Sequence, residues 1–268
     1  MKRFPILFLL FMPIFGFGQV KTDSLITLFE QSNYLETPTY KGTIEYCNRL
    51  VESSKMVKMI TLGKSARGLD IPMLVVDKNG FSSPNSIRKA GRAIIFIQAC
   101  VHPGEPDGKD AGFMLIRNLV SRNINTSLLD FVSILFVPIF NVDGHERWGA
   151  YNRINQNGPK EMGWRTTAGN YNLNRDYLKA DAIEMQHWLK MYNKWNPDFL
   201  FDCHTTDGAD YQYAITYSLE TSGNLDPAIS SWLENTYLKT ITPKMDSLGY
   251  PIFPYIIFRN WHDPRSGI

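Results

Sequence analysis

Three side chains of this sequence have the chemistry of a metal site. His102 and Glu105 lie three residues apart, and His204 follows about a hundred residues later. Two imidazoles and one carboxylate are the protein ligands of a catalytic zinc site that leaves one position open for water. Because Pro103 and Gly104 separate the first two ligands, these lie in a turn and not on a helix with ligands one turn apart. We therefore predict that Zn2+ is the cofactor and that these three residues bind it.

An amide and a guanidinium suited to binding an anion lie between the candidate ligands in the sequence. Asn174 and Arg175 are adjacent, and a guanidinium can bind a carboxylate through two parallel hydrogen bonds. A bound metal activates water for attack on a carbonyl group. A metal beside an anchor for a carboxylate indicates hydrolysis close to the C-terminus of a peptide, so we expect a peptide substrate.

Two buried strands are expected to bring the histidines together. Residues 93–99 form a nearly continuous apolar run, typical of a strand covered on both faces, and lead the chain to His102. Residues 198–203 form a similar run that ends at His204. Side chains at the carboxyl ends of strands in an open α/β sheet meet in the crevice where such folds bind ligands. Because side chains alternate along a strand, Asp202 shares the face of His204 and could orient a ligand, bind substrate or serve the structure alone.

The rest of the chain alternates strands with helices. The expected elements, in order, are helical stretches at residues 23–31 and 42–54, a β-hairpin at 56–62 and 69–77, a helix that opens at Pro106-Asp107, a buried strand at 131–140, a long polar loop at 141–175, a helix at 180–192, a strand at 211–217 and a helix at 227–248. This alternation favours one α/β domain with a mostly parallel mixed central sheet, helices on both faces and the hairpin at one edge.

The N-terminus has the composition of a secretory signal peptide. Residues 1–18 begin with basic residues, continue as an apolar run and end with small residues at alternate positions. A membrane anchor is the alternative, but the run is too short to span a bilayer and contains Pro5 and Pro13. We predict cleavage after Gly18, a catalytic domain at residues 19–268, a secreted or periplasmic location and no stable membrane insertion.

Charge and cysteine usage narrow the choice of partners and crosslinks. The formal net charge is +2 and no basic stripe is present, so nucleic acid is not an expected partner. Three cysteines do not form a disulfide framework. Cys100 and Cys203 each lie within two residues of a candidate ligand and could pair, although two buried reduced thiols are the favoured interpretation.

Taken in order, these residues resemble the zinc carboxypeptidase family, the carboxypeptidase A-like metallopeptidases. The resemblance spans roughly residues 57 to 217 and rests on His102-x-x-Glu105, Asn141-Val142-Asp143-Gly144, Trp164-Arg165, Asn174-Arg175 and His204. It implies a zinc carboxypeptidase-like fold of the phosphorylase/hydrolase-like type, with the zinc ligands named above. It also implies that Asn174 and Arg175 bind the terminal carboxylate of the substrate, and that Arg165 polarises the scissile carbonyl and stabilises the oxyanion.

Three positions depart from the pattern of that family. Gly104 lies where some members carry an arginine, so a contact with the substrate is missing there. The family often has an aspartate two residues before the Asn-Arg pair, where it accepts a hydrogen bond from a zinc-binding histidine, and this chain has Asn172. The amide carbonyl can still accept, but it carries no charge. The catalytic base of the family is a glutamate on a late strand, whereas this chain offers only Glu220 and Glu234 after His204, and neither lies on an apolar strand.

These observations lead to one predicted function and two alternatives. We predict a secreted zinc metallopeptidase that acts as a C-terminal exopeptidase, in a chain that is incomplete at its C-terminus and lacks the general base. Tyr250 and Tyr255 are the loose candidates for the catalytic tyrosine. The first alternative is a zinc amidase that acts on cell-wall peptides or N-acyl amino acids. The second is a non-catalytic protein that binds zinc or peptides.

Overall fold

The structure, a computed structural model, describes residues 25–219 and 224–255. The chain divides into two compact units after Thr205. The predicted signal peptide at residues 1–18 and the candidate base Glu220 lie outside the described residues. In the part of the chain that the structure describes, no helix is long and apolar enough to cross a bilayer.

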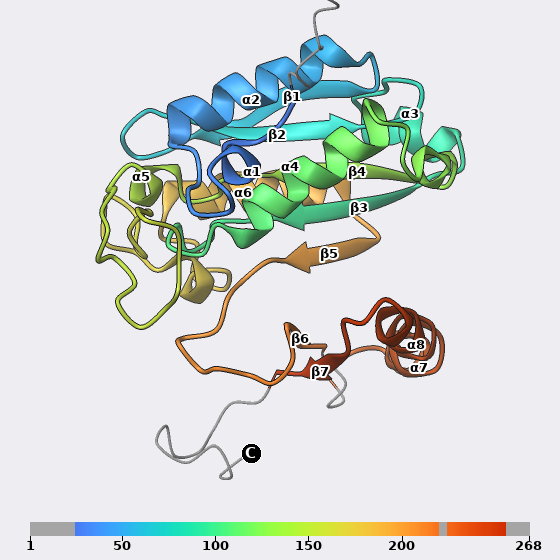
Figure 1. The fold of residues 1–268 in the computed structure, drawn as a ribbon. Helices are drawn as coiled ribbons and strands as arrows, with labels where there is room; N and C mark the ends of the chain where they lie inside the picture. The colour runs from blue at the N-terminus through green and yellow to red at the C-terminus, as the bar shows by residue number, and fades with distance from the viewer. Residues whose placement is uncertain (1–24, 220–223, 256–268) are drawn as a thin grey trace, which may run out of the picture. The chain divides into compact units, whose positions relative to one another are not determined.

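A five-stranded mixed sheet forms the centre of the first unit (Figure 1). Its strands lie in the order β1-β2-β4-β3-β5, with β1 and β2 antiparallel, β2 and β4 antiparallel, and β3 parallel to both β4 and β5. The predicted mixed sheet with an N-terminal hairpin at one edge is confirmed, although two of its four pairings are antiparallel. The strands are β1 (Val57–Lys64), β2 (Asp70–Val76), β3 (Ala93–Gln98), β4 (Val132–Val137) and β5 (Phe199–Asp202).

Helices cover both faces of this sheet, as predicted (Figure 1). The helices α2 (Tyr40–Ser53) and α4 (Asp107–Val120) pack on one face, and α6 (Ile183–Trp195) packs on the other. Phe113 of α4 meets Phe136 of β4 edge to face, with ring centroids 5.5 Å apart. The shorter helices of this unit are α1 (Leu28–Gln31), α3 (Pro84–Lys89), η1 (Thr126–Asp130), α5 (Val142–His145) and η2 (Leu173–Arg175).

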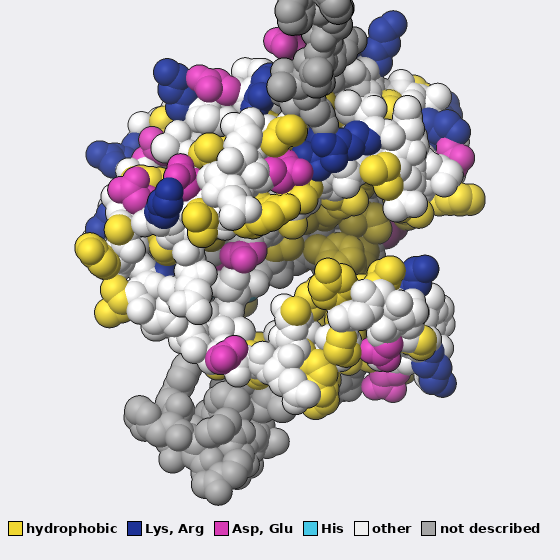
Figure 2. Space-filling view, in the orientation of Figure 1, with side chains coloured by type: hydrophobic (Ala, Val, Ile, Leu, Met, Phe, Trp, Pro, Cys, Tyr) yellow, Lys and Arg dark blue, Asp and Glu magenta, His cyan; other side chains and the backbone are white. Residues whose placement is uncertain are grey.

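The prediction of a third strand buried on both faces is wrong for β5. Among the described residues of the first unit, β5 pairs with β3 alone and is therefore an edge strand. Its side chains are half-buried or exposed, Phe201 is 41% exposed, and hydrophobic side chains gather along this margin of the unit in Figure 2. An apolar run shows that a strand is suited to burial, whereas its position in the sheet decides how much of it is covered.

The second unit contains a small parallel sheet and one long helical segment. Strand β6 (Ile215–Tyr217) pairs with β7 (Ile252–Pro254), and the rings of Tyr213 and Phe253 stack 4.8 Å apart. The predicted helix at residues 227–248 is present, as α7 (Pro227–Trp232), the π-helical η3 (Leu233–Leu238) and α8 (Lys239–Ser247). Strand β7 was not predicted from the sequence.

Buried polar side chains attach the N-terminal segment of the first unit to α4. The ammonium group of Lys109 is fully buried and donates to the Pro38 carbonyl at 2.7 Å and to Nε2 of His145 at 3.0 Å. The next residue of the same helix, Asp110, accepts a hydrogen bond of 2.6 Å from the Thr37 hydroxyl. Because α4 begins two residues after Glu105, these contacts also fix the start of the helix that follows the candidate metal ligands.

Replacement of Asp110 by asparagine should stabilise the protein more at pH 7 than at pH 4. Burial raises the pKa of Asp110 to about 6, although Lys109 and the Thr37 hydroxyl act in the opposite direction. Ionisation of this carboxylate therefore destabilises the folded state. The loss of stability is absent below the pKa of the unfolded state, about 4, and grows as the pH rises to about 6. Relative to the parent, the variant should gain about 1–2 kcal/mol between pH 4 and pH 7. Urea denaturation of both proteins at both pH values measures this gain, and a difference independent of pH would contradict it.

Candidate metal centre

The candidate ligands come from turns that leave the same edge of the sheet. His102 and Glu105 lie in the turn after β3, which the hydrogen bond from Glu105 N–H to the His102 carbonyl closes at 2.9 Å. His204 follows β5 by two residues. Because β3 and β5 are parallel and Gln98 lies beside Asp202 in the register, both strands end at one level. The two turns are therefore brought together by the pairing of these strands.

The three ligand side chains converge on one point. Nδ1 of His102 lies 2.9 Å from Oε1 of Glu105, and Nδ1 of His204 lies 3.0 Å from Oε2 of the same carboxylate. All the ligand atoms that this group offers lie within 4.8 Å of one another. The backbone N–H of Thr205 also donates to Oε2 of Glu105, at 3.1 Å.

The other nitrogen of each histidine ring has an oxygen partner. Nε2 of His102 lies 3.1 Å from Oδ1 of Asn172, and Nε2 of His204 lies 3.0 Å from Oδ2 of Asp202. With a metal bound, these oxygen partners would hold the ring proton on Nε2 and leave Nδ1 free to coordinate the ion. Two imidazole Nδ1 atoms and a carboxylate that face one point are the donor set of a cation site, and these nitrogen and oxygen atoms fit zinc. Of the three roles open to Asp202, its contact with His204 supports the orientation of a ligand.

Electrostatics favour a cation at the same point. Burial acts to raise the pKa of Glu105, but hydrogen bonds from His102, His204 and Arg153 hold it well below its usual range. Burial acts to lower the pKa of His204, but the Asp202 and Glu105 carboxylates outweigh it and raise the pKa to about 9. Glu105 is therefore ionised, and its carboxylate and that of Asp202 are the negative charges that face His204.

Two arginines approach Glu105 from the long loop between β4 and α6. Nη1 of Arg165 lies 3.6 Å from Oε1, and the Arg165 side chain is 31% exposed. Arg153 donates a hydrogen bond from Nη1 to the same oxygen, and its side chain is only 6% exposed. Arg165 was predicted from the sequence but Arg153 was not, because an arginine in a polar loop carries no local signal that it folds back onto a buried carboxylate.

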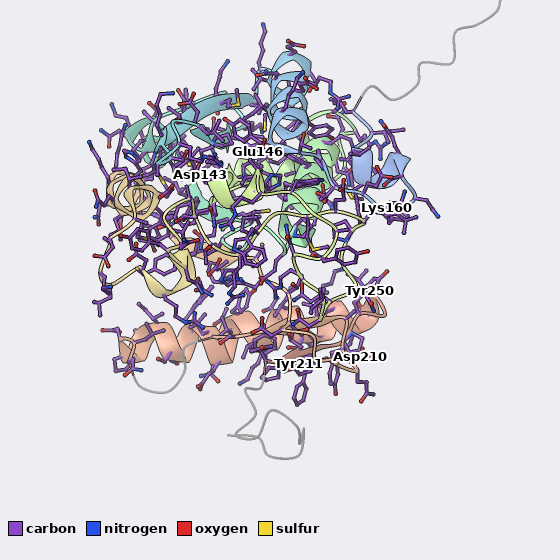
Figure 3. All side chains as sticks on the ribbon, turned by 90° about the vertical axis from the view of Figure 1, so that its left-hand side faces the viewer. Asp143, Glu146, Lys160, Asp210, Tyr211 and Tyr250 are labelled. Carbon is purple, nitrogen blue, oxygen red and sulfur yellow. The ribbon has the colours of Figure 1, made fainter. Side chains whose placement is uncertain are left out.

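The Asn141–Gly144 motif of the sequence holds the backbone that carries Arg165. Asn141 accepts a hydrogen bond from Gly144 N–H at 2.9 Å and donates from Nδ2 to the Arg165 carbonyl at 3.3 Å. A Cβ atom at Gly144 would lie 2.5 Å from the Thr166 carbonyl oxygen, so only glycine allows this close approach. Asp143, labelled in Figure 3, accepts a hydrogen bond from the hydroxyl of Ser65 in the turn between β1 and β2.

The predicted carboxylate-binding pair lies on η2, next to the partner of His102. Oδ1 of Asn172 caps η2 by accepting from Asn174 N–H at 3.0 Å, and the same oxygen faces Nε2 of His102. Arg175 is exposed and donates from Nη1 to the Asn174 carbonyl at 2.8 Å. One short turn therefore carries both a partner of a candidate ligand and the two residues predicted to bind the substrate carboxylate.

The two cysteines beside the ligands are reduced and buried or half-buried. Burial raises the pKa of Cys100 to about 12 and that of Cys203 to about 11, so both are neutral thiols at physiological pH. Cys100 has a φ of +52°, a left-handed conformation that is uncommon outside glycine and that turns the chain from β3 toward His102.

The described candidates for the general base and the catalytic tyrosine lie in the second unit. Glu234 lies on η3 of the second unit. Tyr250 is 56% exposed after α8, where Figure 3 labels it, and Tyr255 lies just beyond β7 with its ring 5.7 Å from that of Tyr211. Their catalytic roles stay predictions.

Three comparisons with known proteins point to one family. The zinc carboxypeptidase family matches residues 43–238, which cross the boundary between the two units. Carboxypeptidase 2 of Trichophyton rubrum is 25% identical over 231 residues, which are 82% of this chain and 40% of that protein.

Solved structures share the fold at low sequence identity. A carboxypeptidase A-type protein of Shewanella denitrificans superposes with a TM-score of 0.62 at 22% identity, over 85% of this chain and 54% of that one. A metallo-carboxypeptidase of Pseudomonas aeruginosa, solved in complex with (2-guanidinoethylmercapto)succinic acid, has a TM-score of 0.56 at 21% identity, over 82% and 51%. The chain thus spans about half the length of the relatives it matches. The family match over most of the sequence, in the α/β fold of these structures, establishes that the chain belongs to the zinc carboxypeptidase family.

Proposed function

We propose that this protein is a zinc-dependent C-terminal exopeptidase that removes residues from the free carboxyl end of peptides. The observation that carries this proposal is the position of η2. Its Asn172 contacts His102 of the candidate metal site, and Asn174 and Arg175 follow directly in the same turn. An anchor for a carboxylate this close to the ligands would place the last peptide bond of a substrate, and not an internal one, at the metal.

His102, Glu105 and His204 are the residues that would hold the zinc ion. When bound, zinc supplies a Lewis acid that polarises a carbonyl group and lowers the pKa of a coordinated water. Asn172 and Asp202 keep the two imidazoles oriented with Nδ1 toward the ion. This arrangement of partners supports a site whose ligands are aligned before substrate arrives.

Arg165 is the residue that we assign to the oxyanion. Its guanidinium lies 3.6 Å from Glu105 yet its side chain remains 31% exposed, so it can reach both the metal site and a bound substrate. Donors placed where negative charge develops stabilise the transition state of acyl transfer, typically by about 3–4 kcal/mol for each donor. The hydrogen bond from Asn141 to the Arg165 carbonyl fixes the backbone from which this side chain extends.

Asn174 and Arg175 are the residues that we assign to the terminal carboxylate of the substrate. Arg175 is exposed, so its guanidinium is accessible to a ligand, and it is well suited to bidentate binding of a carboxylate. The succinic acid derivative in the Pseudomonas aeruginosa structure is itself a carboxylate compound, which is consistent with such a site in a protein of the same fold.

A matched pair of peptides tests the proposed function. The zinc-loaded protein should bind an N-blocked tripeptide with a free carboxyl end, and release its last residue where a general base is present, and it should neither bind tightly nor cleave the C-terminally amidated twin. Equal cleavage of both peptides would reject carboxyl-end recognition, and a preference for N-acyl amino acids or cell-wall peptides would identify an amidase instead. Zinc-dependent binding of the free-ended peptide without turnover would identify a non-catalytic binding protein.

We also propose export across a membrane, with residues 1–18 as the cleaved signal peptide. The basic start, apolar run and small residues of this segment support the proposal. N-terminal sequencing of the mature protein should begin at Gln19, and recovery of the intact N-terminus from cells would reject cleavage.

A further inference from the structure

Arg153 reaches the candidate ligands from a loop to which the proposed function assigns no role. The loop comprises residues 149–162, and its ends are joined by two backbone hydrogen bonds between Gly149 and Met162, of 3.0 and 3.2 Å. Asn152 strengthens this closure by donating to the Met162 carbonyl at 2.8 Å. Tyr151 and Ile154 on the outside of the loop are each 84% exposed, whereas Arg153 between them is buried. The loop thus directs one charged residue inward while its neighbours face solvent.

The Arg153 side chain lies directly on the turn that carries the ligands. Its guanidinium donates to Oε1 of Glu105, and its aliphatic stem passes over Gly104. A Cβ atom at position 104 would lie 2.4 Å from Cγ and 3.1 Å from Cδ of Arg153, so the stem occupies the space that a side chain there would need. Directly after the loop, Gly163 lies close enough to Pro103 that a Cβ atom at 163 would approach the proline Cβ to 2.5 Å. Two points of contact therefore join the loop to the turn.

Burial separates the role of Arg153 from that of Arg165. Both guanidinium groups face Oε1 of Glu105, but Arg165 remains 31% exposed and Arg153 only 6%. Arg153 is therefore much less accessible to a substrate than Arg165. What Arg153 can do is restrain Glu105, because a carboxylate that accepts a charge-assisted hydrogen bond on one oxygen loses rotational freedom.

We infer that Arg153 is a positioning residue for the metal ligand Glu105, and that Gly104 lacks a side chain so that the Arg153 stem can reach it. The inference rests on the metal site of the proposed function. Two effects of Arg153 oppose each other: its charge disfavours a second cation nearby, while the orientation it gives the carboxylate favours one. Loss of a hydrogen-bonding partner of a metal ligand typically weakens metal binding 10–100-fold, so the orientation effect should prevail.

Zinc affinity measured by competition with a chromophoric chelator tests the inference. Arg153→Met should weaken zinc binding by about 10–100-fold, and Arg153→Lys should also weaken it, because an ammonium group retains the charge but not the planar fork. The matched control is Arg147→Met, since Arg147 lies near the base of the same loop over the Trp164 ring, with 5.1 Å to its centroid. Unchanged or tighter zinc binding by Arg153→Met would overturn the inference.

A double-mutant cycle tests the link between Arg153 and Gly104. Gly104→Ala should displace the arginine stem and weaken zinc binding in the parent, and it should have less further effect when Arg153→Ala has already removed that stem. Additive losses in the double variant would show that Gly104 acts independently and would overturn that part of the inference. Circular dichroism in excess chelator establishes that each variant is folded.

Zinc binding by the parent protein distinguishes failure of this inference from failure of the proposed function. If the parent binds zinc and Arg153→Met binds it equally well, the positioning role alone is rejected. If the parent binds no zinc, both the proposed metal site and the positioning role of Arg153 are rejected.

Discussion

Replacement of His204 by alanine should remove most of the zinc that the parent protein retains. His204 contributes one of the two Nδ1 atoms that face Glu105, and it comes from a different strand than the other two ligands. Without it, His102 and Glu105 remain as a two-ligand turn. If the 10–16 kcal/mol of a structural zinc site is shared among its ligands, one ligand corresponds to about 3–4 kcal/mol, or roughly a 10²–10³-fold loss of affinity.

Metal analysis after dialysis against a weak chelator measures this effect. The parent should retain one zinc ion per chain and the His204→Ala variant very little. His187→Ala is the matched control, because His187 lies on α6 and does not belong to the group of converging ligand atoms. Full retention of zinc by the His204 variant, or an equal loss from the His187 variant, would reject the assignment of the three ligands.

Replacement of Arg175 by alanine should abolish the preference for a free carboxyl end. A charge-assisted hydrogen-bonding partner of a carboxylate contributes about 2–3 kcal/mol when the pair is shielded from water, which corresponds to a roughly 30–150-fold loss of affinity. The loss should affect only the peptide that ends in a carboxylate. The amidated twin presents no charge to Arg175, so its weak binding should stay the same in parent and variant.

Titration calorimetry with both peptides on the zinc-loaded protein measures the difference, and kcat/KM for the free-ended peptide measures its consequence for turnover. Arg147→Ala is the matched control, since Arg147 is also an exposed loop arginine but contacts Trp164 and Asn170 instead of η2. If the Arg175 variant still distinguishes the two peptides as the parent does, the carboxylate is recognised elsewhere and the exopeptidase proposal loses its main support.

The hairpin and the central strands could be predicted from the sequence because their signals are local. The apolar run of β3 and the glycine-rich turn between β1 and β2 are each contained within a few residues. Helix α3 was not predicted, although its start has a local signal too: Ser83 caps the helix and Pro84 occupies its first turn. A short strand such as β7 carries no pattern long enough to identify it.

The position of β5 shows where local patterns stop being informative. Its residues are as apolar as those of an inner strand, yet in the first unit it lies at the edge of the sheet and leaves Phe201 41% exposed. Burial on both faces depends on which segments lie next to a strand, and that is a property of the whole chain and not of the four residues of β5.

Some features of the candidate site could likewise be predicted from local sequence, and others depend on the whole fold. The sequence by itself determined the types of the ligands, the turn that carries His102 and Glu105, and the strand that leads to His204, because each depends on adjacent residues. Only the tertiary structure decided which side chains restrain them. Asn172 meets His102 from 70 residues away and Arg153 meets Glu105 from 48 residues away. Contacts over such separations arise when strand pairing and loop closure bring distant segments together. The family resemblance indicated the contact of Asn172 with a candidate histidine, whereas no spacing within the sequence could indicate that of Arg153 with Glu105.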